Sequence, residues 1–120
     1  RAPASILTSR PGQIGEAAII AGFGRSDNSE TTRLRAGSTN LSSVTQAYLQ
    51  TPYAPPSSSI CQGDSGGPIF LKQGTGWAVA GISSATSESA CNTGENFYLP
   101  VVHPAVRAFI LEHVPGLVQR

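Results

Sequence analysis

Charge is scarce in this sequence, and the scarcity excludes several kinds of partner. Charged residues make up 12% of the 120-residue chain, and the formal net charge is +1. We therefore expect no binding to nucleic acid or to an anionic membrane surface, because both require a basic face. The sequence has no apolar run as long as a membrane span, and we expect no signal peptide within it. Because it begins at Arg1 and not at Met, we expect a mature or excised segment of something longer.

Cysteine is also rare, whereas turn-forming residues are abundant. Cys61 and Cys91 are the two cysteines; they are compatible with one disulfide in an oxidising compartment, or with two buried free thiols. The 13 glycines and 9 prolines, with many serines and threonines, are typical of short strands joined by turns. A chain of this length is one domain at most, and it is long enough to form a core. We expect an all-β protein that is secreted or otherwise outside the cytoplasm.

The most informative stretch is residues 61–68, Cys-Gln-Gly-Asp-Ser-Gly-Gly-Pro. The glycines around Ser65 permit positive φ angles and a close approach of another chain. Pro68 prevents a helix from continuing directly after the serine. Ser65 is therefore expected on a sharply turned loop whose backbone N–H groups face a ligand. An exposed hydroxyl beside such donors is what an acyl-transfer nucleophile requires.

A second motif fits the same letters but not their surroundings. Residues 63–67 satisfy G-x-S-x-G, the nucleophile elbow of α/β-hydrolases, which needs a strand before the serine and a helix after it. Pro55 and Pro56 precede the motif here, and Pro68 follows it. The elbow interpretation therefore fails.

Residues 61–68 closely resemble the nucleophile loop of trypsin-like (chymotrypsin-fold) serine proteases. Gly22-Phe23-Gly24 resembles the segment that opens the second barrel of these proteases. The resemblance extends to about Val114 and covers only the second half of such a protease. It implies an all-β fold, an antiparallel Greek-key six-stranded barrel with a C-terminal helix. The implied divisions are an interdomain linker (1–16), the barrel with its helix (17–114) and a tail (115–120).

Apolar runs locate the expected elements. A hairpin turn is predicted at Lys72–Gly76, and Pro100 favours a sheet edge or a bulge. A helix is predicted from His103-Pro104, with an apolar stripe from Val106 to Val114 that packs on the barrel as in the family. The predicted strands are residues 17–24, 34–41, 44–53, 69–71, 77–82 and 96–102.

The resemblance assigns roles to the residues of the loop. Ser65 would attack the scissile carbonyl, and the N–H groups of Gly63 and Ser65 would form the oxyanion hole, where each donor contributes about 3–4 kcal/mol. Asp64 matches the acid that pairs with a freed N-terminal ammonium and supports the hole. A disulfide between Cys61 and Cys91 is also implied, and it would stabilise the fold by about 3–4 kcal/mol.

The family's specificity pocket maps onto a further set of residues. Ser59, six positions before the nucleophile, would lie at the bottom of the pocket and supplies no negative charge for a lysine or arginine substrate. The backbone of Ser84 matches the strand that pairs with an extended substrate. We expect a narrow, uncharged pocket for small or medium apolar residues. The substrate-binding residues implied are Ser59, Gln62, Ser84, Ala85, Thr86 and Asn96.

A catalytic base is missing from the sequence. His103 and His113 are the two histidines, and both belong to the predicted helix, where we interpret them as cap or surface residues. Asp27 is interpreted as a turn residue. The main hypothesis is a serine endopeptidase acting on peptides or proteins, whose His and Asp come from an N-terminal half; the alternative is a protease-like domain that binds without cleaving. No cofactor or metal is expected, and the barrel alone would expose surface for self-association.

Overall fold

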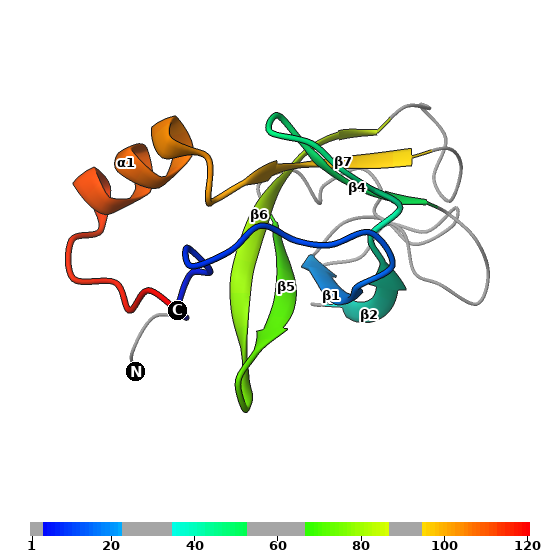
Figure 1. Cartoon of the computed structure of the whole chain (residues 1–120), viewed down its shortest axis with the longest axis horizontal. Coiled ribbons are helices and arrows are strands. Elements are labelled where there is room, and N and C mark those ends of the chain that lie inside the picture. The colour runs from blue at the N-terminus through cyan, green and yellow to red at the C-terminus, as the bar shows by residue number, and fades with distance from the viewer. Residues whose placement is uncertain (1–3, 23–34, 53–66, 87–94) are drawn as a thin grey trace.

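The computed structural model describes residues 4–22, 35–52, 67–86 and 95–120. These ranges contain a sheet of seven antiparallel strands and one helix (Figure 1). The prediction of an all-β antiparallel fold that ends in a helix is therefore confirmed. The elements are β1 (Ala17–Gly22), β2 (Arg35–Asn40), β3 (Ser43–Val44), β4 (Leu49–Pro52), β5 (Pro68–Gln73), β6 (Gly76–Thr86), β7 (Glu95–Pro100) and α1 (Pro104–His113).

One bent strand closes the sheet. The strand order is β2-β1-β5-β6-β7-β4-β3, so β2 and β3 stand at its two ends, yet only Leu41 and Ser42 separate them in the chain. The Leu41 N–H donates to the Glu16 carbonyl just before β1, and the Ser42 N–H donates to the Gln50 carbonyl in β4. Residues 35–44 therefore act as a single strand, whose first part (β2) pairs with β1 and whose last part (β3) pairs with β4. Because β2 and β3 count as one strand, the closed sheet is a six-stranded barrel. β5 returns beside β1, as a Greek key requires.

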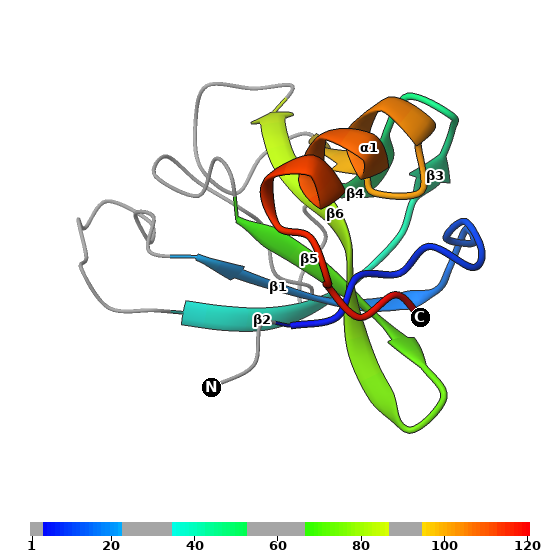
Figure 2. The ribbon, with the colours of Figure 1, turned by 90° about the vertical axis from the view of Figure 1, so that its left-hand side faces the viewer.

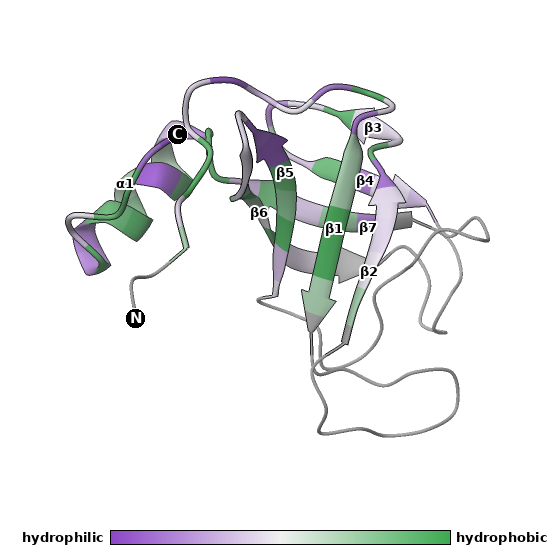
Figure 3. Cartoon of the chain, turned by 90° about the horizontal axis from the view of Figure 1, so that it is seen from below, coloured by the Kyte–Doolittle hydropathy of each residue, from purple (hydrophilic) through white to green (hydrophobic). Residues whose placement is uncertain are grey.

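Side chains that alternate along the strands fill the barrel. Ile69 and Leu71 in β5 are fully buried, and Ala18 and Ile20 in β1 are almost so. Figure 3 shows these apolar strands β1 and β5 side by side. The predicted apolar runs thus supply most of the core, and Leu7 joins them from the segment predicted as a linker. The other members of the core are Leu41, Leu49, Ala78, Ala80 and Tyr98.

The hairpin turn predicted at Lys72–Gly76 is confirmed. β5 runs to Gln73 and pairs there with Gly76, so only Gly74 and Thr75 form the loop. Gly74 has φ 65°, a left-handed conformation that glycine adopts without a Cβ clash. Two-residue loops of this kind match the twist of the strands that they join.

The prediction of one strand over residues 44–53 is wrong in its first part. The chain turns before β4 begins at Leu49, and the turn is made by a threonine side chain. Thr45 Oγ1 accepts hydrogen bonds from the N–H groups of Ala47 (3.2 Å) and Tyr48 (2.9 Å). The Thr45 N–H also donates to the Tyr48 carbonyl (2.9 Å). These local bonds compete with strand pairing, and a scan for apolar alternation does not detect them.

Gly81 marks a close approach of three strands. It pairs with Ile69 in β5 and with Pro100 in β7, and both ladders shift register nearby. A Cβ at this position would lie 3.0 Å from Ile69 Cγ2 and 3.1 Å from both the Leu99 carbonyl oxygen and Tyr98 Cβ. The strands reach this separation because glycine has no side chain.

β7 ends at Pro100, and the chain then turns. The last pair between β7 and β4 is Tyr98 with Leu49, so no residue of β4 pairs with Pro100. The missing N–H of the proline therefore costs no hydrogen bond to β4. The predicted edge position is wrong for the strand as a whole, because β7 lies between β6 and β4 and Pro100 pairs with Gly81. The N–H of Val101, which is fully buried, donates to the Ala80 carbonyl (2.9 Å). This bond fixes the point from which the helix departs.

Helix α1 begins where the sequence predicted but does not bury its apolar stripe. His103 Nδ1 accepts a hydrogen bond from the Ala105 N–H (3.2 Å), and Pro104 follows the cap. No residue of the helix is buried; Phe109 is 62% exposed and Val114, just after it, is 44% exposed. The expectation that the stripe packs on the barrel is therefore wrong. The turn after β7 directs the helix away from the sheet, as Figures 1 and 3 show; in Figure 2, which is seen from that side, α1 lies in front of the strands.

The N-terminal segment and the C-terminal tail pair with each other beside β6. Ile6 forms parallel bridges both to Val79 in β6 and to Gln119 in the tail. The Ile6 N–H donates to the Val118 carbonyl (2.9 Å), and the Arg120 N–H donates to the Ile6 carbonyl (2.8 Å). The tail thus returns to the barrel after the helix.

A polar clamp fixes the next part of the N-terminal segment to the β5–β6 hairpin. Arg10 forms an ion pair with Glu16 (2.7 Å) and donates hydrogen bonds to the Gln73 side chain and the Lys72 carbonyl, both at 3.0 Å. The hydrogen bond to the Glu16 carboxylate raises the pKa of Arg10 above its usual value. The contacts of Arg10 with Glu16, Gln73 and Lys72 attach the start and end of residues 10–16 to the hairpin.

Candidate active site

The proposed nucleophile loop lies mostly outside the described residues. The predictions for Ser59, Cys61, Gln62, Gly63, Asp64, Ser65 and Cys91 all fall in residues 53–66 or 87–94, which the structure does not describe. Its final residues, Gly67 and Pro68, are described. The Ser83 N–H donates to the Gly67 carbonyl at 2.7 Å. This bond attaches the end of the loop to β6 immediately before Ser84.

Three of the predicted substrate-binding residues lie at the C-terminal end of β6. Ser84 is exposed, and the β6–β7 register shifts between Ser83 and Ala85, on either side of it. Ala85 pairs with Phe97, and Thr86 pairs with Asn96. The structure thus brings the described members of the predicted pocket together where β6 ends and β7 begins. The irregular ladder leaves Ser84 without a paired residue in β7.

Asn96 is buried and held by a hydrogen bond. Its Nδ2 donates to Thr51 Oγ1 at 3.2 Å, across the β4–β7 pair, and both residues are fully buried. The sequence predicted Asn96 as a pocket wall but did not predict its partner. Thr51 lies two residues after the buried Leu49, so strand alternation places it on the inner face. This spacing was the signal that would have identified it.

Other buried polar groups lie close to this pair. Tyr98 is fully buried two residues after Asn96, and Ser83 is 6% exposed and pairs with Tyr98 in the β6–β7 ladder. Ser83 Oγ makes no hydrogen bond to any residue that the structure describes. The described interior at this end of the barrel is thus polar but carries no formal charge. Such a site accommodates an uncharged group more readily than a cation, because a buried cation needs a paired charge.

The two histidines lie at the other end of β7. His103 caps α1, while His113 is exposed at the end of the helix with Nδ1 2.9 Å from the Phe109 carbonyl oxygen. The His113 ring also contacts the Phe109 ring, with centroids 4.3 Å apart. The interpretation of His103 as a cap and His113 as a surface residue is confirmed. Within the described ranges, therefore, no histidine lies beside Ser84 and Asn96.

The described residues hold neither a metal-binding cluster nor a membrane-spanning helix. Among them, no three histidine, cysteine, aspartate or glutamate side chains gather in a way that would hold a metal ion. In the same part of the chain, no helix has the length and apolarity needed to cross a membrane.

Comparison with known proteins identifies the family. The Trypsin family profile matches residues 2–109, so the chain belongs to the trypsin family. Among solved structures, a mutant of human heparin binding protein (CAP37) has the same fold, with a TM-score of 0.71 and 19% identity. The match covers 95% of this chain and 51% of that chain, so this chain spans about half of its length. No curated protein sequence matches. The described barrel and helix correspond to part of the chymotrypsin fold.

Proposed function

We propose that this chain supplies the nucleophile of a serine endopeptidase, which cleaves peptide bonds through an acyl-enzyme on Ser65. The observation that carries the proposal is Gly-Asp-Ser-Gly-Gly-Pro at residues 63–68 of a trypsin-family chain. The Gly67 carbonyl accepts a hydrogen bond from Ser83, so the end of the motif lies beside the predicted substrate strand at Ser84. In this proposal the N–H groups of Gly63 and Ser65 stabilise the oxyanion, and Asp64 supports them.

The substrate preference proposed is for small or medium apolar side chains. Asn96 is held by Thr51, so its amide occupies fixed space at the expected pocket wall. Ser59 would contribute a hydroxyl at the bottom of the pocket, and no formal charge. An arginine or lysine side chain would therefore lose its hydration without gaining a paired charge, which is strongly unfavourable.

The base and its orienting acid are proposed to come from a second, N-terminal half. A serine needs an adjacent base before it attacks a carbonyl, and the described residues place no histidine at this end of the barrel. The chain spans about half of the matched structure. The exposed Phe109 and Val114 provide an apolar face that such a half, or a second copy, would cover. We further propose an extracytoplasmic location, where Cys61 and Cys91 would be oxidised.

A labelling experiment tests the proposal. The purified chain is incubated with a serine-directed phosphonate and a peptide library, alone and with a polypeptide that carries the His/Asp half. We expect no labelling alone, because loss of a triad member leaves only about 10³–10⁴-fold acceleration over water. Labelling and turnover should appear with the partner and disappear in Ser65→Ala. Labelling without the partner would show that the base is internal.

The second hypothesis, a domain that binds without cleaving, is the other outcome of this experiment. Tight association with the partner but no labelling of Ser65 would favour it. The matched structure is named as a heparin binding protein. Heparin binding is not part of the proposal for this chain, because a net charge of +1 gives little long-range attraction to a polyanion.

A further inference from the structure

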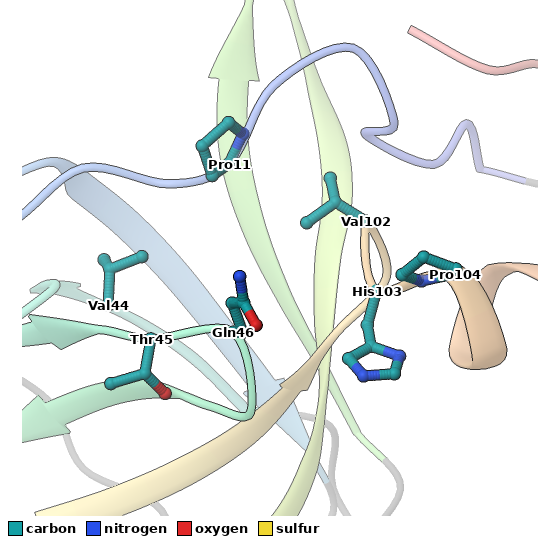
Figure 4. Close-up of a pocket in the computed structure, with 7 residues that line it drawn as sticks. All are labelled: Pro11, Val44, Thr45, Gln46, Val102, His103 and Pro104. Carbon is teal, nitrogen blue, oxygen red and sulfur yellow. The ribbon is translucent and has the colours of Figure 1, made fainter.

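A pocket of about 610 Å³ opens at the end of the barrel where α1 begins. Three segments that are distant in sequence line it: the N-terminal segment at Pro11, the β3–β4 turn at residues 44–46, and the β7–α1 junction at residues 102–104. Figure 4 shows Val44 on one side of the opening and Val102 on the other. This volume lies within the roughly 300–1,000 Å³ that is usual for ligand pockets.

The pocket is separate from the described members of the predicted substrate-binding site. β7 runs from Glu95, beside the substrate-binding residues, to Pro100, and the pocket lining begins two residues later at Val102. Likewise β4 runs from the turn that lines the pocket to Thr51, which pairs with Asn96 in β7. The two sites thus occupy opposite ends of the same pair of strands. Binding at the pocket does not depend on the proposed peptidase activity.

The walls of the pocket are apolar and its lining is uncharged. Pro11, Val44, Val102 and Pro104 supply aliphatic surface, and among the described residues no lysine, arginine, aspartate or glutamate lines the opening. A charged ligand group would lose its hydration there without a partner of opposite charge, which is unfavourable. The lining therefore selects a neutral ligand with an aliphatic part.

Two polar side chains in the pocket have hydrogen-bonding capacity that the described residues do not use. His103 Nδ1 accepts the hydrogen bond from the Ala105 N–H, so in the neutral ring Nε2 carries the proton and donates. The side-chain amide of Gln46 is exposed and makes no hydrogen bond to a described residue. An amide presents one acceptor and two donors, which match the N–H and C=O groups of a peptide backbone.

We propose that this pocket binds an extended, uncharged peptide segment. Its backbone amide groups meet Gln46 and Nε2 of His103, and an aliphatic or prolyl side chain lies between Val44 and Val102. A sugar of the same size carries more hydroxyl groups than these two side chains can satisfy, and buried groups without partners weaken binding. A peptide in polyproline II conformation also enters with little loss of conformational entropy.

The experiment uses the full 120-residue chain and the capped peptide acetyl-Pro-Leu-Pro-amide. The ring Cε1–H signals of the two histidines are followed by NMR during titration. We expect a saturable shift of His103 at micromolar to millimolar peptide and no shift of His113, which lies at the other end of α1. Peptides with glutamate or lysine in place of leucine should bind at least about tenfold more weakly. Equal binding of the charged peptides, or no saturable shift, would overturn the proposal.

Matched variants test the contacts. Gln46→Met keeps the length of the side chain but removes its amide, and we expect about three- to tenfold weaker binding, the loss of one hydrogen bond. Gln119→Met, an exposed position outside the pocket, is the control and should bind like the original chain. His103→Asn retains a capping side chain while removing the ring donor, and it should also weaken binding. Unchanged affinity in both Gln46→Met and His103→Asn would refute the proposed contacts.

Discussion

Replacing Thr51 with valine tests whether the buried hydrogen bond to Asn96 stabilises the proposed pocket wall. The bond joins two neutral groups at 3.2 Å, and both residues are fully buried, so water does not replace the lost partner. A net hydrogen bond contributes about 0.5–1.5 kcal/mol, and a buried donor left unpaired costs about 1–3 kcal/mol. Because valine has a similar shape, we expect the free energy of unfolding to fall by about 1–2 kcal/mol.

Thr39→Val is the matched control for Thr51→Val. Thr39 is 3% exposed, and its Oγ1 makes no hydrogen bond to any described residue. The same substitution should therefore leave stability unchanged or raise it slightly, since it removes a buried polar group without a partner. Urea unfolding is followed by circular dichroism and by the fluorescence of Trp77, the single tryptophan. Equal shifts of the two midpoints at unchanged slope would refute the reasoning.

Three further predictions concern packing, the cysteines and specificity. Gly81→Ala should destabilise the barrel by about 1–3 kcal/mol because the added Cβ would crowd the backbone. Gly76→Ala is the control and should leave stability unchanged, since nothing lies within 4 Å of its Cβ position. Comparable urea midpoints for the two variants would contradict this prediction. Cys61 and Cys91 should form a disulfide, and two free thiols in a titration of the unreduced, unfolded chain would show otherwise. If the proposed endopeptidase is reconstituted with a His/Asp half, we expect a preference for small or medium apolar residues at the cleavage site, and a library profile dominated by arginine or lysine would exclude a pocket based on Ser59.

The barrel was predictable because its signals are local. Apolar runs such as Ile69–Leu71 indicated strands, and the glycine in the Lys72–Gly76 hairpin turn indicated how two of them connect. Closure of the sheet into a barrel has no such local signal, because it depends on hydrogen bonds from Leu41 and Ser42 to opposite ends of the sheet. No spacing in the sequence shows this change of partner. The family resemblance supplied it instead.

The helix shows a limit of apolar periodicity. The stripe that includes Phe109 was detected correctly, but a stripe indicates only which face is apolar and not what covers it. The chain leaves β7 after the bond from Val101 to Ala80, and this direction takes α1 away from the strands. No pattern in the sequence indicates the angle at which α1 leaves the barrel.

The candidate site was predicted in part. Asn96 was identified from the resemblance, whereas Thr51 was overlooked because a polar residue in a strand is usually expected to face solvent. Alternation with Leu49 places it inside, so the pairing of β4 with β7 determines the position of the Asn96 amide. The loop around Ser65 has the most specific sequence motif of any segment. Residues 53–66, which include Ser65, lie outside the described ranges.

β4 and β7 connect the two proposed sites but do not make them equivalent. At one end of these strands, Thr51 and Asn96 bury neutral polar groups that bond each other. At the other end, Gln46 and His103 present neutral polar groups with unused capacity to an open pocket. The hydrogen bond between Thr51 and Asn96 holds the pocket wall in place. The unused donors and acceptors of Gln46 and His103 favour ligand binding instead, because a ligand restores the hydrogen bonds that burial would otherwise remove. A variant at Gln46 should therefore change peptide binding without changing stability, and a variant at Thr51 should do the reverse.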